Sequence, residues 1–339
     1  MIDRRIFLGA ALAAIGCGRR GPSNAASKLV AYLWSQQSDD GGWHSKTYGL
    51  MRSGQSLTPF VLEGLLAFYG NNAKPQDKID RAFAFLDKNT NAEGAIGLSD
   101  SATPDYPNYA TGLAVSAAAR AHRDSSKWVA CLRHQQFTED NGWHRDDAAY
   151  GAWGMGGERR TPPEAGHVDL AMTRYVMEGL AAAGVKPEDP TMQKALVYLG
   201  RCQNPDGGFF FSTVNLDTNK AGEENGHYRS YGTTTCDGVL SLRAAGVPLS
   251  DARIKKAQAW LKENHLESRA PGFDKEPARL GWSDGLRLYY AAAVIRAMPG
   301  LPIELPPQRE DGSFVNTNNL VKEDDPILAS GLVLRCMPT

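Results

Sequence analysis

The sequence predicts an all-α chain built from six helical-hairpin repeats. Three observations predict it: apolar residues recur at helical spacing, a Gln…Gly-aromatic segment returns along the chain, and strand-like alternation of apolar and polar residues is scarce. Self-similarity at a period of about 50 residues is typical of repeat architectures, in which neighbouring units bury a common core.

Residues 1–16 are expected to lie outside this fold. Arg4 and Arg5 precede a short uncharged apolar run, which is typical of a secretion signal and too short to span a bilayer. The paired arginines resemble a twin-arginine export signal, and the run ends in a segment that resembles a bacterial lipobox. We therefore expect cleavage before Cys17 and a lipid on its side chain. An ordinary signal cleaved near Ala25 is the alternative.

The mature chain is expected to consist of a tether, 17–27, and a single domain, 28–339. A diacylglyceryl anchor buries many methylenes, at about 0.8 kcal/mol each, and would hold the domain on a membrane face. The expected location is the periplasmic or cell-envelope face of a bacterial membrane, with the membrane as a partner. Charges nearly balance, at 37 Lys and Arg against 38 Asp and Glu, so nucleic acid binding is not indicated.

Each repeat opens with an amphipathic helix that ends in the Gly-aromatic segment. The clearest copies run from Gln37 to Trp43 and from Gln203 to Phe209. Weaker copies are expected at 136–143 and 308–314, and degraded copies at 91–96 and 271–273.

A second helix follows in each repeat and contains a glycine step. Glycine in a helix interior costs about 1 kcal/mol relative to alanine, so close approach of neighbouring helices is the expected reason. Six glycines are interpreted as sharing one repeat position: Gly64, Gly112, Gly179, Gly238, Gly285 and Gly331. Capping residues or prolines mark first turns at Thr58-Pro59, Pro107-Asn108 and Asp325-Pro326.

The Gln-x-x-Asp-Gly-Gly-Trp/Phe units resemble the repeats of the terpenoid cyclase and protein prenyltransferase β-subunit superfamily. The resemblance covers essentially the whole mature chain. It implies an α/α toroid, in which six inner helices line a central cavity and six outer helices surround them. In that superfamily the motifs are structural, because the glutamine caps a helix end and the aromatic residue stacks over the turn.

Three catalytic patterns carried by toroids are incomplete in this chain. The Asp-x-Asp-Asp motif of the squalene–hopene cyclase family is missing. Of the prenyltransferase zinc ligands only Asp284 matches, because Leu286 stands at the cysteine position and Asp324 at the histidine position. The thioester motif is incomplete around Cys17. The expectation is therefore no metal and no cofactor, and the missing motifs weigh against enzymatic activity without deciding it. The other cysteines lack metal spacing and are expected to be buried free thiols: Cys131, Cys202, Cys236 and Cys336.

Chain order within the repeat predicts that all inner helices begin at one end of the ring. Their N-terminal N–H groups favour an anionic or electron-rich ligand there. The two longest loops, 143–167 and 203–231, are expected at the same end, and simple packing over the next repeat is their alternative role. Candidate ligand-binding residues on these loops are Tyr150, Trp153, Arg159, Tyr228, Arg229 and Tyr231.

Adjacent inner helices are also expected to gather a histidine, carboxylates and a thiol into an acid/base or metal cluster. The catalytic candidates are His167, Asp169, Asp237 and Asp284, with Cys236 beside them. Helix capping is the alternative for His167 and Asp169. Asp237 is interpreted as sharing its repeat position with Thr111 and Ser330, which favours packing.

Three functions stay open at this level. The favoured one is a lipid-anchored toroid that binds a ligand or partner without covalent chemistry, because the scaffold is intact and the catalytic motifs are missing. The ligand would be hydrophobic, anionic or a glycan. The alternatives are a prenyltransferase-like, terpenoid cyclase-like or polysaccharide-acting enzyme with a divergent site, and a structural envelope protein. An apolar, aromatic cavity would favour an isoprenoid ligand, and one lined by carboxylates and tryptophans a glycan.

Overall fold

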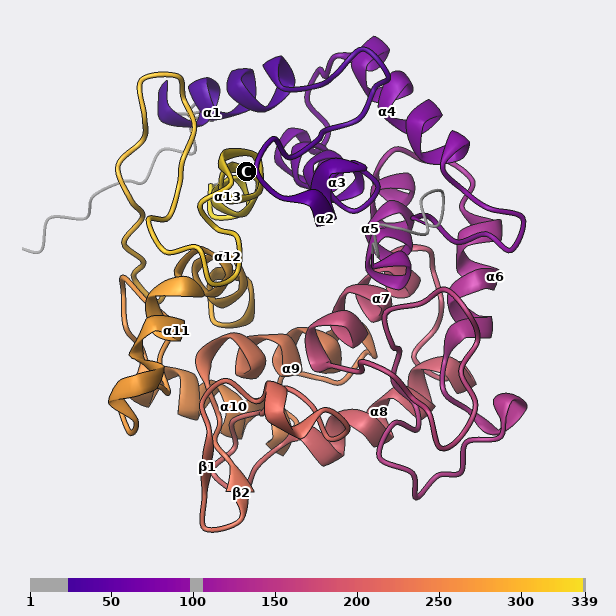
Figure 1. The fold of residues 1–339 in the computed structure, drawn as a ribbon, viewed down its shortest axis with the longest axis vertical. Coiled ribbons are helices and arrows are strands. Elements are labelled where there is room, and N and C mark those ends of the chain that lie inside the picture. The colour runs from indigo at the N-terminus through magenta and orange to yellow at the C-terminus, as the bar shows by residue number, and fades with distance from the viewer. Residues whose placement is uncertain (1–23, 98–105, 338–339) are drawn as a thin grey trace, which may run out of the picture.

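The computed structural model describes residues 24–97 and 106–337, and in this part of the chain two rings of helices surround a central opening (Figure 1). The inner ring consists of α3 (Leu57–Tyr69), α5 (Pro107–Arg120), α7 (Leu170–Ala182), α9 (Gly232–Ala244), α12 (Arg287–Ala297) and α13 (Pro326–Leu334). The outer ring consists of α1 (Asn24–Ser35), α4 (Gln76–Lys88), α6 (Ser126–Gln135), α8 (Pro190–Cys202) and α10 (Ala252–Asn264). Each inner helix contacts the next, and α13 contacts α3, so the ring is closed. The predicted all-α toroid is confirmed.

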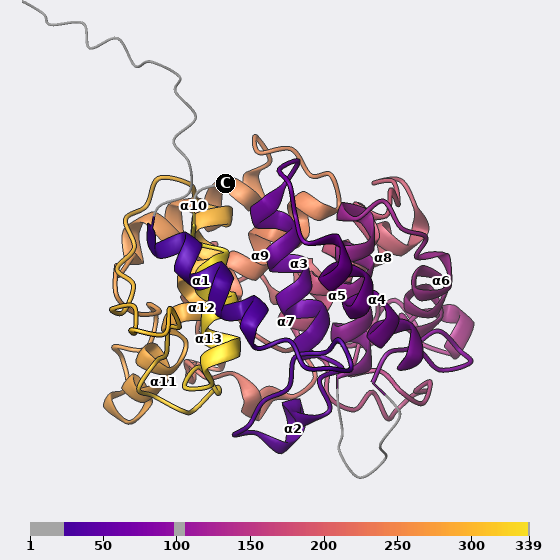
Figure 2. The same ribbon diagram turned by 90° about the horizontal axis from the view of Figure 1, so that it is seen from above.

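Short elements occupy the loops between the helices. α2 (Gly49–Arg52) and α11 (Leu280–Gly285) lie toward one face of the ring (Figure 2). β1 (Glu223–Glu224) and β2 (His227–Tyr228) pair antiparallel, with Glu223 opposite Tyr228. The 3-10 turns are η1 (Glu139–Asn141), η2 (Leu216–Thr218) and η3 (Pro277–Arg279).

The sixth repeat lacks an outer helix, which differs from the expected hairpin. Residues 301–309 carry no regular secondary structure. Three prolines, Pro302, Pro306 and Pro307, fall in this segment. Proline has no backbone N–H and clashes with the preceding turn, so a helix is excluded here. The segment still ends in a Gly-aromatic copy that joins it to α13.

The Gly-aromatic copies connect neighbouring outer helices. In each of four copies the glutamine Nε2 donates to the carbonyl of its own motif glycine and to a carbonyl at the start of the next outer helix. These glutamines are Gln37, Gln136, Gln203 and Gln308. The last of them reaches Ala25 of α1, at 2.9 Å, so the motif also joins the two ends of the ring.

The motif copy in the third repeat is not where the sequence pattern predicts it. Gln136 donates to the carbonyl of Gly151 rather than Gly142, and Trp153 Nε1 donates to the Leu132 carbonyl, as Trp43 Nε1 does to that of Leu33. The copy therefore ends at 151–153, and residues 137–150 stand where the other copies have three residues, so this copy contains an insertion. Gly142 and Trp143 belong to the insertion, so the expected boundary at 136–143 is wrong.

A matched pair of substitutions checks this register. Gly142 and Gly151 both have a φ of 85°, so alanine strains the backbone equally at the two positions. A Cβ on Gly151 would lie 2.0 Å from the carbonyl oxygen of Lys194, whereas a Cβ on Gly142 would meet only the Pro162 ring at 3.5 Å. We expect Gly151→Ala to lower the free energy of unfolding by about 1–3 kcal/mol more than Gly142→Ala, measured by chemical denaturation. Equal losses of unfolding free energy in the two variants would contradict the assignment of Gly151 to the motif.

The six glycine steps do not share one repeat position. One position is defined by the hydroxyl that accepts a hydrogen bond from the last motif N–H, and its occupants are Thr58, Thr111, Thr235 and Ser330. Counted from that hydroxyl residue, Gly112 follows directly, Gly238 three residues later and Gly64 six residues later. Thr235, not Asp237, is therefore equivalent to Thr111 and Ser330. Asp237 lacks the packing explanation that the sequence pattern offered for it.

Close approach of inner helices does explain part of the glycine pattern. A Cβ on Gly179 of α7 would lie 2.4 Å from the carbonyl oxygen of Gly112 in α5.

The expected caps are also present, since Pro107 begins α5 and the Asp325 side chain accepts from the N–H groups of Ile327 and Leu328 at the start of α13.

Several expectations fall on the ends of the chain. The signal at 1–16, the lipid on Cys17 and most of the tether lie outside the described residues, and they stay predictions, which fractionation of a Cys17→Ala variant would test. α1 begins at Asn24, within the segment expected as tether. Within residues 24–97 and 106–337 no helix is long and apolar enough to cross a membrane. Cys131, Cys202, Cys236 and Cys336 are buried free thiols, as expected.

Candidate functional site

The ring encloses a cavity of about 550 Å³ at the N-terminal ends of the inner helices. The sequence predicted that the mouth of the cavity would lie at this end of the ring. All six inner helices contribute to the wall, together with α2, α11 and the loop around η2. Most lining side chains are apolar or aromatic, among them Met51, Phe60, Tyr109, Met172, Phe211, Tyr231, Trp282 and Tyr289. A cavity of this size and character is typical of a small-molecule site.

Asp237 of α9 is one of three buried carboxyl groups that line this cavity in the described part of the chain. It lies more than one helical turn beyond Thr233, which also lines the wall, and it is 1 % exposed. Its Oδ1 accepts hydrogen bonds from Arg174 Nη1 and from the Tyr289 hydroxyl, both at 3.0 Å. Burial raises the pKa of Asp237 to about 6, although Arg174 and Tyr289 favour the ionised form. Asp237 is therefore partly protonated near neutral pH.

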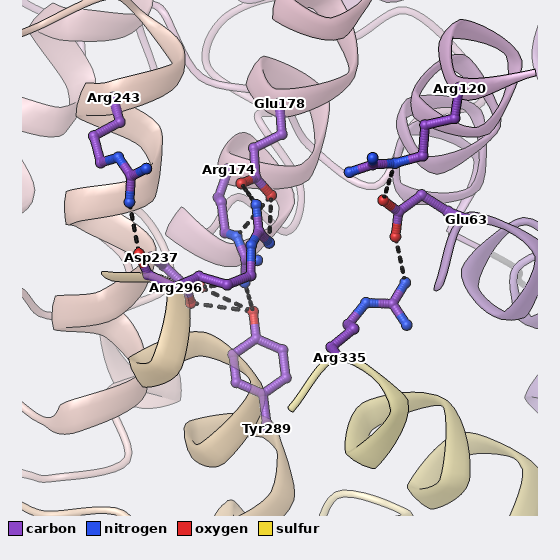
Figure 3. Close-up of polar contacts among 9 residues, drawn as sticks. All are labelled: Glu63, Arg120, Arg174, Glu178, Asp237, Arg243, Tyr289, Arg296 and Arg335. Atoms are coloured by element: carbon purple, nitrogen blue, oxygen red, sulfur yellow. Dashed lines mark hydrogen bonds and ion pairs between the residues drawn. The ribbon is translucent and has the colours of Figure 1, made fainter. Parts of the chain in front are cut away.

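Arg174 connects Asp237 to a second carboxylate (Figure 3). It is buried in α7, and its Nε donates to Glu178 at 3.0 Å while its Nη1 donates to Asp237. Glu178 also pairs with Arg296 of α12. Burial raises the pKa of Glu178, but the two arginines outweigh it and lower that pKa to about 2. Arg174 is thus held in place from both sides and fixes the position of Oδ1 on Asp237.

The raised pKa of Asp237 has a consequence for stability. The pKa of this carboxyl rises from 3.8 to about 6 on folding, so the folded state holds its proton more tightly than the unfolded chain does. This contribution to the free energy of unfolding is fully present at low pH and is lost as the pH rises through 6. Asn cannot ionise, so the stability of Asp237→Asn relative to the wild type should increase between pH 4 and 7, by on the order of 2 kcal/mol. Chemical denaturation across that range measures the difference. A difference independent of pH would show that Asp237 ionises freely in the fold.

Polar and charged side chains gather closer to the mouth. His167 Nε2 lies 2.8 Å from Asp169 Oδ2, and Oδ1 of Asp169 caps α7 by accepting from the Met172 N–H. Lys220 Nζ lies 3.8 Å from the ring centroid of Phe211, and burial lowers the pKa of this lysine. The mouth of the cavity therefore carries groups of both charges.

Glu323 supports the wall rather than the chemistry. Its two oxygens accept from the N–H groups of Leu288 and Tyr289, each at 2.8 Å, so it caps the first turn of α12 from a neighbouring loop. Burial raises its pKa to about 7. Because Tyr289 stands on this turn, Glu323 also fixes the hydroxyl that contacts Asp237.

The catalytic candidates from the sequence divide into two groups. His167, Asp169 and Asp237 all line the cavity, as expected. Asp284 is exposed at the end of α11 and does not line it. Cys236 is buried in α9 and is also absent from the wall, since it and Asp237 are adjacent on the helix and point in different directions. The expected five-residue cluster is therefore incomplete.

Of the six loop residues proposed to bind a ligand, only Tyr231 lines the cavity. Tyr150 donates to Glu139, and the Trp153 ring is part of the motif described above. Arg159 donates to the His134 carbonyl, Tyr228 lies on β2, and Arg229 pairs with Glu276. These five side chains hold the loops in place, which was the alternative role. Their direct contact with a ligand is not supported.

Sequence reasoning missed the two partners of Asp237. Arg174 had a usable signal, because α7 is otherwise apolar apart from Glu178, and a buried charge needs a partner. Tyr289 had none, since nothing in the sequence gives the rotation of α12. The prenyltransferase zinc set does not fit either, and no three His, Cys, Asp or Glu side chains of the described residues come together to hold a metal ion.

Comparisons with known proteins find likeness in structure only. No family model and no curated protein matches the sequence. Among solved structures, the type II terpene cyclase MstE from Scytonema aligns with a TM-score of 0.56 at 16% identity, covering 93% of this chain and 96% of that chain. The chain has the α/α toroid fold of terpene cyclases. A protein from Actinoplanes aligns with a TM-score of 0.53 at 16% identity, covering 92% of this chain and 97% of that one.

The enzymes among these neighbours correct the functional expectation. A variant of MstE was solved with its substrate, geranylgeranyl dihydroxybenzoate, at a TM-score of 0.56, 16% identity and coverage of 93% and 95%. A glycosidase aligns with a TM-score of 0.52 at 13% identity, covering 92% of this chain and 95% of that chain. The expectation of a binding protein without covalent chemistry is contradicted, and the alternative of an enzyme with a divergent site fits these neighbours better.

Proposed function

We propose that the protein is a terpenoid cyclase-like enzyme that folds an isoprenoid chain in the central cavity and starts its cyclisation with a proton from Asp237. The observation that carries this proposal is the buried carboxyl of Asp237, which has a pKa of about 6 and accepts hydrogen bonds from Arg174 and Tyr289, in a cavity whose wall is mostly apolar and aromatic. The neighbours with bound terpenoid substrate and product support it at the level of the fold.

The contacts of Asp237 fit an acid. Oδ1 accepts both of the shorter hydrogen bonds, from Arg174 and Tyr289, so the proton is carried on Oδ2, to which Tyr289 makes a longer contact of 3.2 Å. Transfer of that proton to a substrate double bond leaves a carboxylate that the same two donors stabilise. The Asp-x-Asp-Asp pattern is not required for this role, because Arg174 and Tyr289 come from other helices.

The cavity wall fits the reaction that follows. The protonated double bond becomes a carbocation, and its neighbouring double bonds close rings by successive C–C bond formation. Aromatic faces attract such cations, by about 0.5–2 kcal/mol each. Tyr109, Tyr231 and Trp282 contribute such faces. An apolar wall also excludes water, which would otherwise capture the cation early. Loss of a proton ends the sequence, so the product is an isomer of the substrate.

Incubation with polyprenyl substrates tests this function. The mature protein would be incubated with geranylgeraniol, geranylgeranyl diphosphate and geranylgeranyl dihydroxybenzoate, and products would be separated by gas chromatography with mass spectrometry. We expect cyclic products of unchanged mass from one of them. Absence of turnover for all three, together with hydrolysis of a glycan, would assign the site to the polysaccharide-acting alternative and overturn the proposal.

A further inference from the structure

A second cavity opens at the opposite end of the ring. It measures about 620 Å³, and the residues that line it come from the C-terminal halves of the inner helices. None of its lining residues also lines the first cavity, and the layer of Arg174 and Asp237 lies between the two. Its charged lining residues are four arginines and two glutamates: Arg120, Arg243, Arg296, Arg335, Glu63 and Glu178.

The arginines come from four different inner helices. Arg120, Arg243 and Arg296 stand in the last turns of α5, α9 and α12, and Arg335 directly follows α13. A basic residue in the last turn is favoured by the helix dipole, which accounts for each position alone. The dipole does not require the side chains to line a common cavity, as they do here. Figure 3 shows two of them, Arg120 and Arg335, on either side of Glu63.

The two glutamates hold most of these arginines in place. Glu63 accepts from Arg120 Nε at 2.9 Å and from Arg335 Nη2 at 2.8 Å, so it bridges α5 and α13. Glu178 pairs with Arg296 on the other side of the cavity. Burial raises the pKa of Glu63, but Arg335 and Arg120 outweigh it and lower that pKa. Both glutamates are therefore ionised, and each is already committed to arginine partners.

The balance of charge in this cavity is positive. Four arginine charges against two glutamate charges leave +2. Of these four arginines, Arg243 has no carboxylate partner among the described residues. Its Nη1 donates instead to the Arg296 carbonyl at 2.6 Å. The Arg335 side chain is largely buried, at 7% exposed, whereas Arg120 and Arg243 are exposed and so are accessible to an anion from solvent. Unpaired cations in a recess attract an anion more strongly than cations on an open surface do.

We propose that this second cavity binds a small, multiply charged oxyanion of the phosphate or diphosphate class. Each guanidinium presents parallel N–H donors, which match the oxygens of such an anion. Arg243 and Arg120 supply the donors, because one makes no ion pair and the other uses only its Nε on Glu63. Glu63 and Glu178 fix the remaining arginines around the anion. The proposal does not rest on the proposed cyclase function.

Calorimetric titration of the folded protein with inorganic pyrophosphate, in a buffer free of phosphate and sulfate, tests this site. We expect saturable binding of one anion, which weakens as NaCl is raised, and about tenfold weaker binding to Arg243→Gln. Arg253→Gln is the matched control, because Arg253 stands on outer helix α10 and pairs with Asp251; it should bind as the wild type does.

Parallel titrations identify the anion class. Inorganic phosphate and succinate carry similar charge, and we expect phosphate to bind and succinate to bind more weakly. Equal binding of succinate would overturn the phosphate assignment. No saturable binding of pyrophosphate, or equal weakening by Arg243→Gln and Arg253→Gln, would overturn the site itself. Thermal unfolding of each variant shows that it is folded when titrated.

Discussion

Asp237→Asn is expected to reduce turnover of the isoprenoid substrate by about 10²–10⁴-fold, because it removes the acid that starts the reaction. Asparagine keeps an oxygen that can accept from Arg174 and Tyr289, so the side chain should stay in its place. The loss should therefore appear in kcat and not in substrate binding. Steady-state kinetics with the substrate identified by product analysis measures both.

Asp217→Asn is the control for this substitution. Asp217 also lines the cavity, but it is exposed on η2 at the mouth. The same chemical change there should leave kcat near the wild-type value. If the two variants lost activity equally, or if Asp237→Asn kept full activity, Asp237 would not be the acid.

Removing Arg174 should have the largest effect on stability. The substitution Arg174→Met leaves Asp237 without its cationic partner in a buried position, while Glu178 keeps Arg296. Breaking a buried ion pair by deleting one member costs about 3–5 kcal/mol. We expect the free energy of unfolding to fall by that amount at pH 8, where Asp237 is ionised, and by less at pH 5, where it is largely protonated.

A double variant separates charge from packing. If the loss arises from an unpaired carboxylate, Arg174→Met combined with Asp237→Asn should recover part of it at pH 8. Lost packing of the long arginine side chain against Tyr175 would not be recovered. A double variant as unstable as Arg174→Met alone, with no pH dependence in either, would show that the ion pair does not govern stability here.

The repeat pattern was sufficient to predict the fold. Helical spacing and the glutamine–glycine–aromatic segments recur because each has a local physical cause, such as the hydrogen bonds of Gln37 and Gln203 to two carbonyls. Insertions and losses were harder to predict. The copy in the third repeat was placed at Gly142 because residues 137–150 contain a similar segment, and the hydrogen bonds of Gln136 and Trp153 identify Gly151 instead.

The site could be predicted only in part, because helix rotation is not encoded in a local pattern. Of the candidates proposed from the sequence, Asp237 and Tyr231 line the cavity, whereas Asp284 does not. Asp284 lies on α11, which ends at Gly285 before α12 begins at Arg287, so it does not share the inward face of Tyr289. Arg174 and Tyr289 lie 63 and 52 residues from Asp237 along the chain. Contacts over such separations need the closed ring.

Deuterium incorporation is the most direct test of the central claim that Asp237 protonates an isoprenoid chain in the apolar cavity. The wild-type protein and Asp237→Asn would be incubated with the polyprenyl substrate in D₂O, and the cyclic product analysed by mass spectrometry and NMR. We predict one deuterium from the wild type, at the double-bond carbon that accepts the proton and lies next to the cationic carbon that closes the ring, and about 10²–10⁴-fold less product from the variant. A cyclic product without deuterium at that carbon, or equal amounts of the labelled product from both proteins, would contradict the claim.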